Sequence, residues 1–330
     1  MPFVYACTGT NDDLVIQYIV NDFFATGTAM SMKLIVTGFM AGNNKRIVFS
    51  EPNARGATCH LDFSDCTVEP NTVAGSDFLT IQSGVSNISI TGLNVSTNRT
   101  FLNIHGDNCT LRDCRFTATG TTPQVMSTPA FGYGGKGLSV HNCKIAGVVY
   151  VFEMFAGAGD CTFYNCEFGR SASNGIAIRI PNNTENPPGS ASFMFCNIIG
   201  GTSAVRIESS NPNSVYRFYG CTIQNVSTGN CILLGAIGGT IIFDGGCVIL
   251  GSATAQSLTF TSSATTASCL ILNNTFRTGQ AISIGSGVGT SKLVVTGNQF
   301  NTSSINVRNT DLTSDMGPRT YIPAYANTFS

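Results

Sequence analysis

The segment Cys161–Phe168, with the sequence CTFYNCEF, is one copy of a motif that decides the fold. The motif alternates apolar and variable residues, then has Asn, Asp or Gly, then Cys or Asn, and ends on an apolar residue. Other copies are Leu61–Val68 (LDFSDCTV), Cys109–Phe116 (CTLRDCRF), Leu138–Ile145 (LSVHNCKI), Tyr216–Ile223 (YRFYGCTI), Cys269–Phe276 (CLILNNTF) and Leu293–Phe300 (LVVTGNQF). About ten copies recur roughly every 26 residues, a period typical of solenoids, in which each unit buries its apolar face against the next.

Each repeat has the pattern of short strands rather than helices. A second alternating segment lies between the motif copies, for example at Ile176–Ile180 and Val205–Glu208. Alternation with a period of two, ended by Gly, Asn or Asp, is typical of strands joined by turns. The sequence therefore predicts an all-β fold, a single-stranded right-handed parallel β-helix of about eleven coils. Because the repeat is continuous, residues 1–330 are predicted to form a single domain.

Composition excludes several classes of function. Of the 330 residues, 11% are charged, and the net charge is -1. Such a chain has no basic field for the phosphates of a nucleic acid, so we expect no nucleic-acid partner. No apolar stretch is long enough for membrane insertion, and Met1–Asp12 lacks the basic and apolar regions of a signal peptide.

Seven of the 13 cysteines hold one place in successive repeats: Cys66, Cys114, Cys143, Cys166, Cys196, Cys221 and Cys247. Asn274, Asn298 and Asn327 take that place in later copies. Stacked coils should place these side chains in an internal column, in which the amides bond the neighbouring turn. A zinc site needs ligands that converge, whereas these thiols are collinear. We therefore predict reduced, buried thiols, no metal site and no cofactor.

Both ends of a β-helix need a cover, because they expose strand edges and an apolar bore. Residues 11–25 predict a capping helix, with Thr10 or Asn11 accepting hydrogen bonds from the first amides. Asp12 and Asp13 favour the positive end of its dipole. Its apolar face would consist of Ile16, Ile19, Val20 and Phe23. Residues 311–330 are predicted to form a polar C-terminal cap.

The run Gly9–Gln17, GTNDDLVIQ, resembles the Asp-Gly-x-x-Asp-Asp-x-x-x-Ile-Gln signature that opens β-helices of the pectate-lyase-like superfamily. The later Asn-Cys-x-Phe and Asn-x-Thr-Phe ends are similar to coil repeats of that superfamily, so the likeness covers nearly the whole chain. It departs at Thr8, where the family usually has Asp, which weakens assignment to an enzymatic branch. The Asp cluster of a pectate-lyase calcium site is also not visible in the sequence.

This opening is common in bacteriophage tailspikes and related virion proteins. The resemblance implies a virion structural protein, either a tailspike, a fibre or a capsid decoration, that binds host-surface polysaccharide. Its expected partners are other virion subunits and a host glycan, and its expected oligomer is a homotrimer. We expect it to be made in the host cytoplasm and to act in the virion.

Residues at equal register on adjacent coils should form outward columns. In each repeat, one such outward residue lies two positions before the Cys and another lies one position after it. On three neighbouring coils, these positions give the densest group of polar and aromatic residues in the sequence. Its members are Arg112, Arg115, His141, Lys144, Tyr164 and Glu167. Cationic groups bind carboxylates and an aromatic face stacks on a pyranose, so this group suits an acidic sugar. The alternative is a solvated face with ordinary cross-strand pairs, such as Lys144 beside Glu167.

The second strand of the repeat supplies another candidate group, comprising Tyr150, Glu153, Arg179, Arg206 and Glu208. Two insertions rich in Pro and Gly, Thr121–Gly137 and Pro181–Ser190, could wall a groove beside it. Glycoside hydrolysis needs two carboxyls, for which Glu153 and Glu208 are the candidates. Lyase chemistry needs a base and a group that neutralises a uronate, for which Arg179 and Arg206 are candidates, as are His141 and Tyr164. A polysaccharide lyase or glycosidase therefore stands as the alternative to a binding protein, and a purely structural virion role as a third reading.

Overall fold

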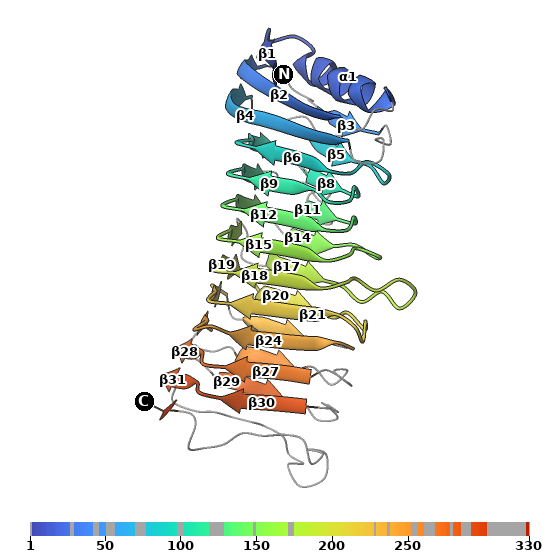
Figure 1. Ribbon diagram of the computed structural model, residues 1–330. Helices are drawn as coiled ribbons and strands as arrows, with labels where there is room; N and C mark the ends of the chain where they lie inside the picture. The colour runs from blue at the N-terminus through green and yellow to red at the C-terminus, as the bar shows by residue number, and fades with distance from the viewer. Residues whose placement is uncertain are drawn as a thin grey trace.

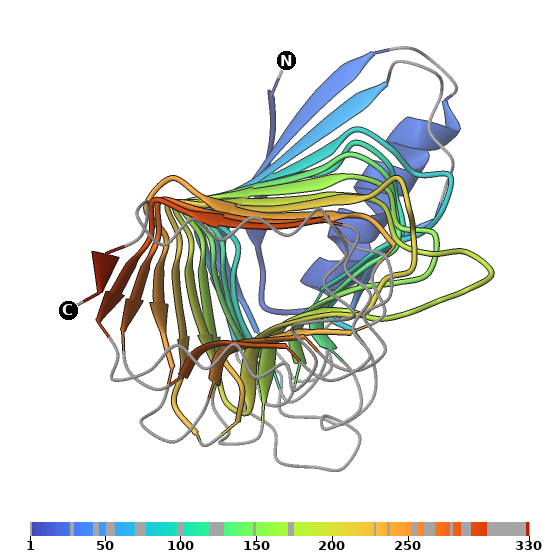
Figure 2. The same cartoon turned by 90° about the horizontal axis from the view of Figure 1, so that it is seen from below.

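The computed structural model confirms the parallel β-helix: the chain winds into a solenoid of three strand stacks (Figure 1). It describes residues 2–26, 30–41, 46–50, 57–69, 77–97, 102–118, 129–147, 150–170, 175–227, 229–235, 238–251, 256–260, 268–277, 280–284, 292–301 and 328–329. Each coil passes through sheet A, then sheet C, then sheet B, and every pair of stacked strands is parallel. Seen along the axis, the sheets enclose one bore (Figure 2).

Sheet A has twelve strands among the described residues. They are β1 (Pro2–Cys7), β2 (Ser31–Met40), β4 (Thr58–Val68), β6 (Ile88–Thr91), β9 (Thr110–Arg112), β12 (Leu138–His141), β15 (Cys161–Tyr164), β18 (Ala191–Met194), β21 (Val215–Tyr219), β24 (Thr240–Asp244), β27 (Ser268–Leu272) and β30 (Lys292–Thr296). Its outer face carries the first predicted polar group.

Sheets C and B have ten described strands each. Sheet C consists of β7 (Asn94–Thr97), β10 (Arg115–Ala118), β13 (Lys144–Gly147), β16 (Glu167–Arg170), β19 (Asn197–Gly200), β22 (Thr222–Asn225), β25 (Val248–Leu250), β28 (Thr275–Arg277), β31 (Gln299–Asn301) and β32 (Thr328–Phe329). Sheet B consists of β3 (Ile47–Phe49), β5 (Leu79–Ile81), β8 (Leu102–Ile104), β11 (Pro129–Tyr133), β14 (Tyr150–Met154), β17 (Ile176–Ile180), β20 (Ser203–Ile207), β23 (Ile232–Leu234), β26 (Gln256–Phe260) and β29 (Gln280–Ile284).

The number of complete coils is smaller than the predicted eleven. Within the described residues, eight coils contain a strand from all three sheets, from β6, β7 and β8 to β27, β28 and β29. The first coils lack a separate sheet C strand, because β4 runs on as one long strand through that position. After β31, the chain enters residues that the structure does not describe. Asn327 and most of the predicted cap at 311–330 also lie outside the described residues.

Inward side chains stack in columns that fill the bore. One column of sheet A begins with Leu34, Leu61, Ile90, Leu111 and Val140, and continues as Phe163, Phe193, Phe218, Phe243 and Ile271. All ten side chains are buried. Neighbouring rings from Phe163 to Phe243 are nearly parallel, with centroids 4.9 to 5.0 Å apart. The period-two pattern of the sequence therefore becomes one continuous core.

The motif's Asn, Asp or Gly forms the corner between sheets A and C. Asp113, Asn142 and Asn165 have φ of 53°, 54° and 51°. Short polar residues tolerate this left-handed conformation because their side chains bond locally, whereas most other residues with a Cβ are strained there. The left-handed residue turns the chain, and the following Cys points inward and is buried. The two residues of this repeated dipeptide thus form the turn between sheets A and C.

The predicted internal column is present. The amide of Cys114 donates to the sulfur of Cys143 on the next coil at 3.4 Å. Lower in the solenoid the Cys247 amide donates to Asn274 Oδ1 at 3.1 Å, and the Asn274 amide to Asn298 Oδ1 at 2.9 Å. Cys and Asn fill the same place because either side chain accepts this bond. All 13 cysteines are reduced.

Helix α1 (Asp12–Ala25) lies across the N-terminal end of the bore (Figure 2). Ile16, Val20 and Phe24 are buried, while Ile19 and Phe23 are partly buried against the same core. Ile16 and Val20 thus confirm the predicted apolar face, and Phe24 is an addition to it. The helix covers the apolar residues that the first coil would otherwise expose.

The predicted N-terminal cap is wrong. Asn11 has φ of 55° and makes no side-chain capping bond. Instead the buried Asp12 carboxylate turns back, accepting hydrogen bonds from the Thr8 amide at 2.8 Å, the Gly9 amide at 3.0 Å and the Tyr5 hydroxyl at 2.8 Å. These bonds join the helix to β1 and outweigh desolvation, so the pKa of Asp12 lies below its usual value.

Candidate functional site

The first predicted polar group assembles as the register requires. In sheet A, Arg112 pairs with His141 and His141 with Tyr164. In sheet C, Arg115 pairs with Lys144 and Lys144 with Glu167. The two rows flank the corner between the sheets on three consecutive coils. We call these six residues, together with Phe195 and Asn197 of the next coil, the corner surface.

Charges within the corner surface are partly neutralised. Lys144 Nζ lies 2.6 Å from Glu167 Oε1, and both side chains are more than one third exposed. This is the cross-strand pair that the solvated-face reading predicts, and an exposed pair of this kind stabilises by about 1 kcal/mol or less. Arg112 and Arg115 are exposed. Arg112 and Arg115, at the end of the corner surface nearer the N-terminus, are therefore the cations that an anionic ligand could bind.

The His141 side chain forms a hydrogen bond with a residue of its own strand. Its Nε2 lies 2.7 Å from the hydroxyl of Ser139, and its ring centroid is 6.1 Å from that of Tyr164. Desolvation and the nearby Arg112 guanidinium lower the pKa of His141. The neutral imidazole is thus favoured near neutral pH, which suits a hydrogen-bonding role toward a ligand.

A cavity of about 300 Å³ opens at the corner. It is lined by Asn142, Cys143, Lys144, Asn165, Cys166, Glu167, Phe195 and Asn197. An amide ladder runs through it: Asn165 Nδ2 donates to Asn142 Oδ1 at 3.0 Å, and Asn142 Nδ2 to Asp113 Oδ1 at 3.1 Å. The corner thus combines amides, an ion pair and an aromatic ring, a mixture found in sites that bind polar ligands with an apolar face.

Phe195 was not among the predicted site residues. It is 50% exposed, and its ring lies between those of Tyr164 and Tyr219, with centroids 5.7 and 5.5 Å away. Tyr164 and Tyr219 are 42% and 36% exposed. The signal was present in the sequence, because Phe195 precedes Cys196 at the position where the motif has Asn, Asp or Gly. The prediction read that position only as a turn.

The second predicted group also assembles, on sheet B. Glu153 pairs in register with Arg179, and Arg179 with Arg206. Arg179 Nη1 binds Glu153 Oε1 at 3.0 Å, and its guanidinium lies 4.6 Å from the centre of the Tyr150 ring. Arg206 Nη2 binds Glu208 Oε1 at 2.6 Å. The five residues thus form two separate ion pairs on neighbouring coils, and the first pair lies beside the Tyr150 ring.

The geometry of this second group supports fewer of the reactions that the sequence analysis considered. Glu153 is buried, and desolvation raises its pKa although Arg179 opposes the shift. Glu153 lies on β14 and Glu208 follows β20, two coils on, a separation of about 10 Å along the stack. Each carboxylate already binds a guanidinium. The pair does not have the closer spacing of a retaining glycosidase, although Glu153 has the raised pKa of a general acid.

The insertion at 181–190 projects from the edge between sheets B and A, after β17 (Figure 1). It is ordered by Asn183, whose Oδ1 accepts hydrogen bonds from the amides of Glu185 and Asn186. It therefore stands on the side of sheet B and away from the corner between A and C. Much of the other insertion, 121–137, lies outside the described residues.

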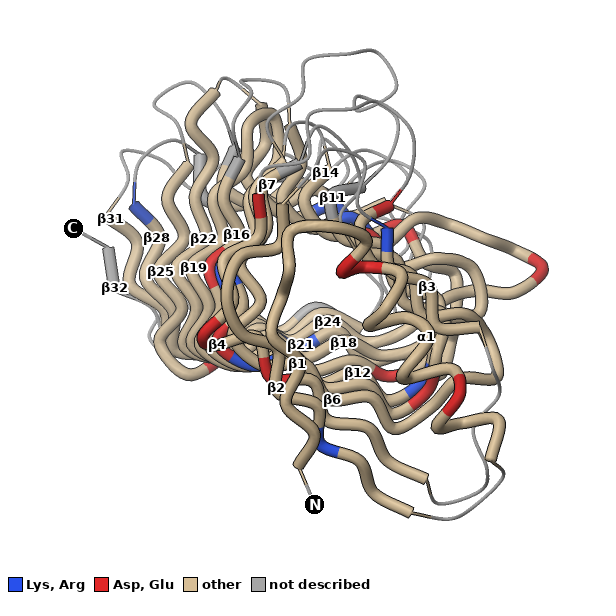
Figure 3. Tube along the Cα trace, turned by 90° about the horizontal axis from the view of Figure 1, so that it is seen from above, with Lys and Arg blue, Asp and Glu red and all other residues tan. Residues whose placement is uncertain are grey.

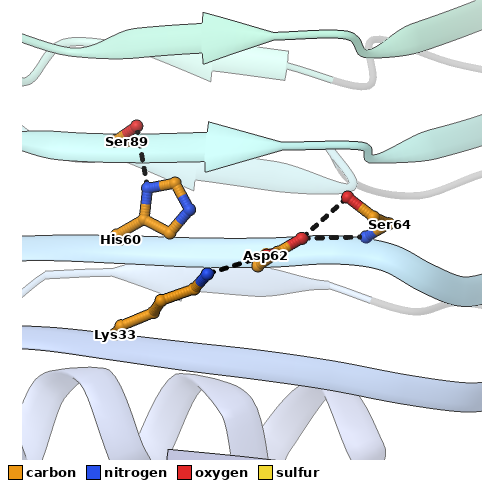
Figure 4. Close-up of polar contacts among 5 residues, drawn as sticks. All are labelled: Lys33, His60, Asp62, Ser64 and Ser89. Carbon is orange, nitrogen blue, oxygen red and sulfur yellow. Dashed lines mark hydrogen bonds and ion pairs between the residues drawn. The ribbon is translucent and has the colours of Figure 1, made fainter. Parts of the chain in front are cut away.

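A third polar cluster covers the outer face of sheet A near the N-terminus (Figure 4). Asp62 binds Lys33 Nζ at 3.1 Å and the Ser64 hydroxyl at 2.7 Å, while His60 Nδ1 lies 3.2 Å from the Ser89 hydroxyl. The carboxylate is thus bound to lysine and serine, and does not orient the imidazole. The cluster consequently lacks the linked acid, base and nucleophile of a catalytic triad.

The described residues contain no group of three or more His, Cys, Asp or Glu side chains arranged to hold a metal ion. No helix in the described part of the chain has the length and apolar character needed to cross a bilayer. Charged positions are few and of mixed sign along the trace (Figure 3). The corner surface and the sheet B group are therefore the two candidate sites that the geometry supports.

No family model matches the chain, and no curated protein matches it. Among solved structures, the Dettilon tailspike protein matches with a TM-score of 0.56 and 14% identity, over 91% of this chain. The chain spans 62% of that tailspike's length. Bacteriophage CBA120 tailspike protein 3 matches with a TM-score of 0.42 and 11% identity, over 89% of this chain and 50% of its own. The fold thus resembles that of the Dettilon tailspike protein.

Proposed function

We propose that this chain is a virion-associated, tailspike-like protein whose corner surface binds a host-surface polysaccharide. The observation that carries the proposal is the set of exposed rings Tyr164 and Phe195 beside a cavity of about 300 Å³ lined by amides and an ion pair. Aromatic side chains supply apolar contact for sugar faces, and amides and charges bind hydroxyls. The tailspike-like fold supports the virion setting.

The rigid scaffold favours binding over a wide surface. Residues of the corner surface come from four consecutive coils whose strands are hydrogen-bonded in register. A ligand that extends along the stack can contact all of them without any movement of the backbone. Preorganised contacts of this kind reduce the entropic cost of binding. A repeating polymer fits this surface better than a small molecule.

The test is direct binding to a panel of purified bacterial capsular and lipopolysaccharide-derived polysaccharides, measured by calorimetry. At least one polysaccharide should bind, and Tyr164→Ala should weaken that binding while circular dichroism stays unchanged. Binding of none of the panel, or equal binding by the variant, would contradict the proposal. Co-purification with phage particles tests the virion setting separately.

A second candidate function is cleavage of the polysaccharide by the sheet B group. It is favoured by the raised pKa of the buried Glu153 and by its contact with Arg179. Incubation with acidic and neutral polysaccharides would then release unsaturated or reducing ends. Glu153→Gln and Arg179→Ala should abolish the release. If release occurs and both variants retain it, the assignment of this group is wrong.

For the assembly, we propose a homotrimer that contacts other virion subunits. Light scattering of the purified chain would then give three times 34.7 kDa. A monomeric mass at all concentrations would contradict the trimer without affecting glycan binding by a single chain. A solely structural virion role predicts assembly without any binding to polysaccharide.

A further inference from the structure

Phe195 occupies a backbone conformation that its side chain does not favour. Its φ is 55°. The corresponding corner position in the other complete coils and in the coil of β30 holds residues that accept this conformation: Gly92, Asp113, Asn142, Asn165, Gly220, Gly246, Asn273 and Gly297. For a bulky residue a positive φ is a genuine outlier and implies that something else maintains it. The fold alone would favour Asn or Gly here.

The Phe195 side chain gains little from the hydrophobic core, because it points outward. Half of its surface is exposed, whereas Phe193, two residues earlier, is fully buried. Its ring is instead nearly perpendicular to the rings of Tyr164 and Tyr219, at 80° and 89°. The three residues sit on the consecutive coils of β15, β18 and β21. They present ring faces in two perpendicular orientations along the solenoid axis.

Glycines on the following coils leave room for these rings. A Cβ added at Gly220 would lie 2.7 Å from Phe195 Cδ1, and one at Gly245 would lie 2.4 Å from Tyr219 Cε2. Both distances are too short for a real contact. The rings therefore lie over glycine backbone, and any larger residue there would displace them. The exposed aromatic arrangement depends on at least two positions besides its own.

We propose that Tyr164, Phe195 and Tyr219 form a stacking platform for an uncharged polysaccharide that runs parallel to the solenoid axis. This inference rests on the proposed function and specifies its ligand. Adjacent coils are about 4.8 Å apart, which is comparable to the length of one sugar residue. Successive pyranoses can therefore meet successive rings, each presenting its C–H face to an aromatic ring.

The groups beside the platform favour a neutral sugar over an anionic one. The charges nearest the Tyr164 end, Lys144 and Glu167, bind each other at 2.6 Å. Asn165 and Asn197 line the same cavity as Phe195 and offer amides for hydroxyl groups. At the other end, the Arg217 guanidinium lies 5.7 Å from the Tyr219 ring centre and Asp244 pairs in register with Tyr219, so charges of both signs flank that ring. The exposed Arg112 is two coils above Tyr164, beyond the platform.

The decisive variant is Phe195→Asn, which removes the ring and restores a residue suited to the left-handed corner. We expect it to raise Tm while weakening binding of uncharged bacterial polysaccharides at least tenfold. Phe195→Tyr retains a ring and should bind within about threefold of the original protein. Tyr18→Ala is the matched control, because Tyr18 is a 71% exposed aromatic residue on α1, far from the platform.

The experiment separates this inference from the proposed function. If the original protein binds polysaccharide and Phe195→Asn binds equally well, the platform is wrong and the broader proposal survives. Binding restricted to acidic polysaccharides would overturn the neutral ligand class. An equal loss in Tyr18→Ala would show that the effect is not specific to the platform. If no polysaccharide binds the original protein, both proposals fail.

Discussion

At the scale of single residues, the internal column shows how one position accepts two side-chain chemistries. Asn298 is buried; its Oδ1 accepts from the Asn274 amide at 2.9 Å, and its Nδ2 donates to the Ile271 carbonyl at 2.8 Å. The cysteines above make weaker bonds to sulfur. The column therefore depends on a small side chain that can accept a hydrogen bond from the backbone of the preceding coil.

Asn298→Ala should destabilise the protein, because the buried Asn274 amide loses its acceptor and the Ile271 carbonyl loses a side-chain donor. An unsatisfied buried amide costs about 1 to 3 kcal/mol, so we expect a loss of at least about 1 kcal/mol in urea unfolding. Asn298→Cys should cost less, because Cys fills this place in seven other coils. Equal losses for both variants would show that the hydrogen bonds contribute nothing beyond volume.

The outward columns of residues could be predicted from the sequence, because the repeat itself sets the register between neighbouring coils of a solenoid. Arg112, His141 and Tyr164 pair as predicted, since each holds the same place relative to an inward Cys. It missed Phe195 because that position was interpreted as a turn, and a turn position carries no information on where a ring points. The Phe195 ring lies against Gly220, one coil further along the sequence, and the Tyr219 ring lies against Gly245, one coil beyond that.

At the scale of elements, helix α1 binds the open edge of sheet B through one polar face. Asp13 accepts a hydrogen bond from the Arg46 amide at 3.0 Å, and Gln17 from the Val48 amide at 2.9 Å. Asn21 accepts from the Ser50 amide at 3.3 Å and donates to the Val48 carbonyl at 3.2 Å. Residues four apart lie on one side of a helix, so this face follows β3.

This ladder satisfies groups that an edge strand would leave open for another chain. Gln17→Ala should therefore lower the free energy of unfolding by about 1 kcal/mol, because the half-buried Val48 amide loses its hydrogen-bond acceptor. It should also increase concentration-dependent aggregation in light scattering. Leu14→Ala, on the exposed face of the same helix, is the control. An effect of equal size in the control would contradict a specific role for the amide.

The helix itself was predictable, but its attachments were not. Periodic apolar residues and two early acids suffice to place a helix over residues 11–25. The two acids were interpreted as dipole partners, whereas Asp12 binds the chain that precedes it and Asp13 binds the Arg46 amide, 33 residues later and directly before β3. Such bonds depend on how the helix crosses the bore, which no local pattern encodes.

Asp12 should make stability sensitive to acid. Because its folded pKa is lowered, it contributes stability above its unfolded value of 3.8, and that contribution is lost as pH falls through the folded pKa. We expect Asp12→Asn to be less stable than the original protein at pH 7 and to lose less stability between pH 5 and pH 3. Chemical unfolding at each pH measures this. Parallel pH profiles for the two proteins would contradict it.

At the scale of the whole molecule, stability is distributed along a stack in which each coil contacts its two neighbours. The fold class was predictable because that stacking imposes one repeat on the entire sequence. The coil count was not, because β4 spans two sheet positions and the terminal repeat leaves the described residues. Ends and centre should therefore differ in local stability, as in other solenoids.

Cysteine alkylation can follow this difference, because the thiols mark most coils. Twelve of the 13 cysteines are buried, and Cys7 is intermediate. Burial raises the pKa of Cys109 and Cys269 to about 12, so neither is reactive in the folded state. Brief native labelling, followed by mass spectrometry, should modify Cys7 first. In mild urea Cys269 should react before Cys166, because fewer coils cover it on one side. Identical rates at Cys269 and Cys166 would show that the solenoid opens as one unit.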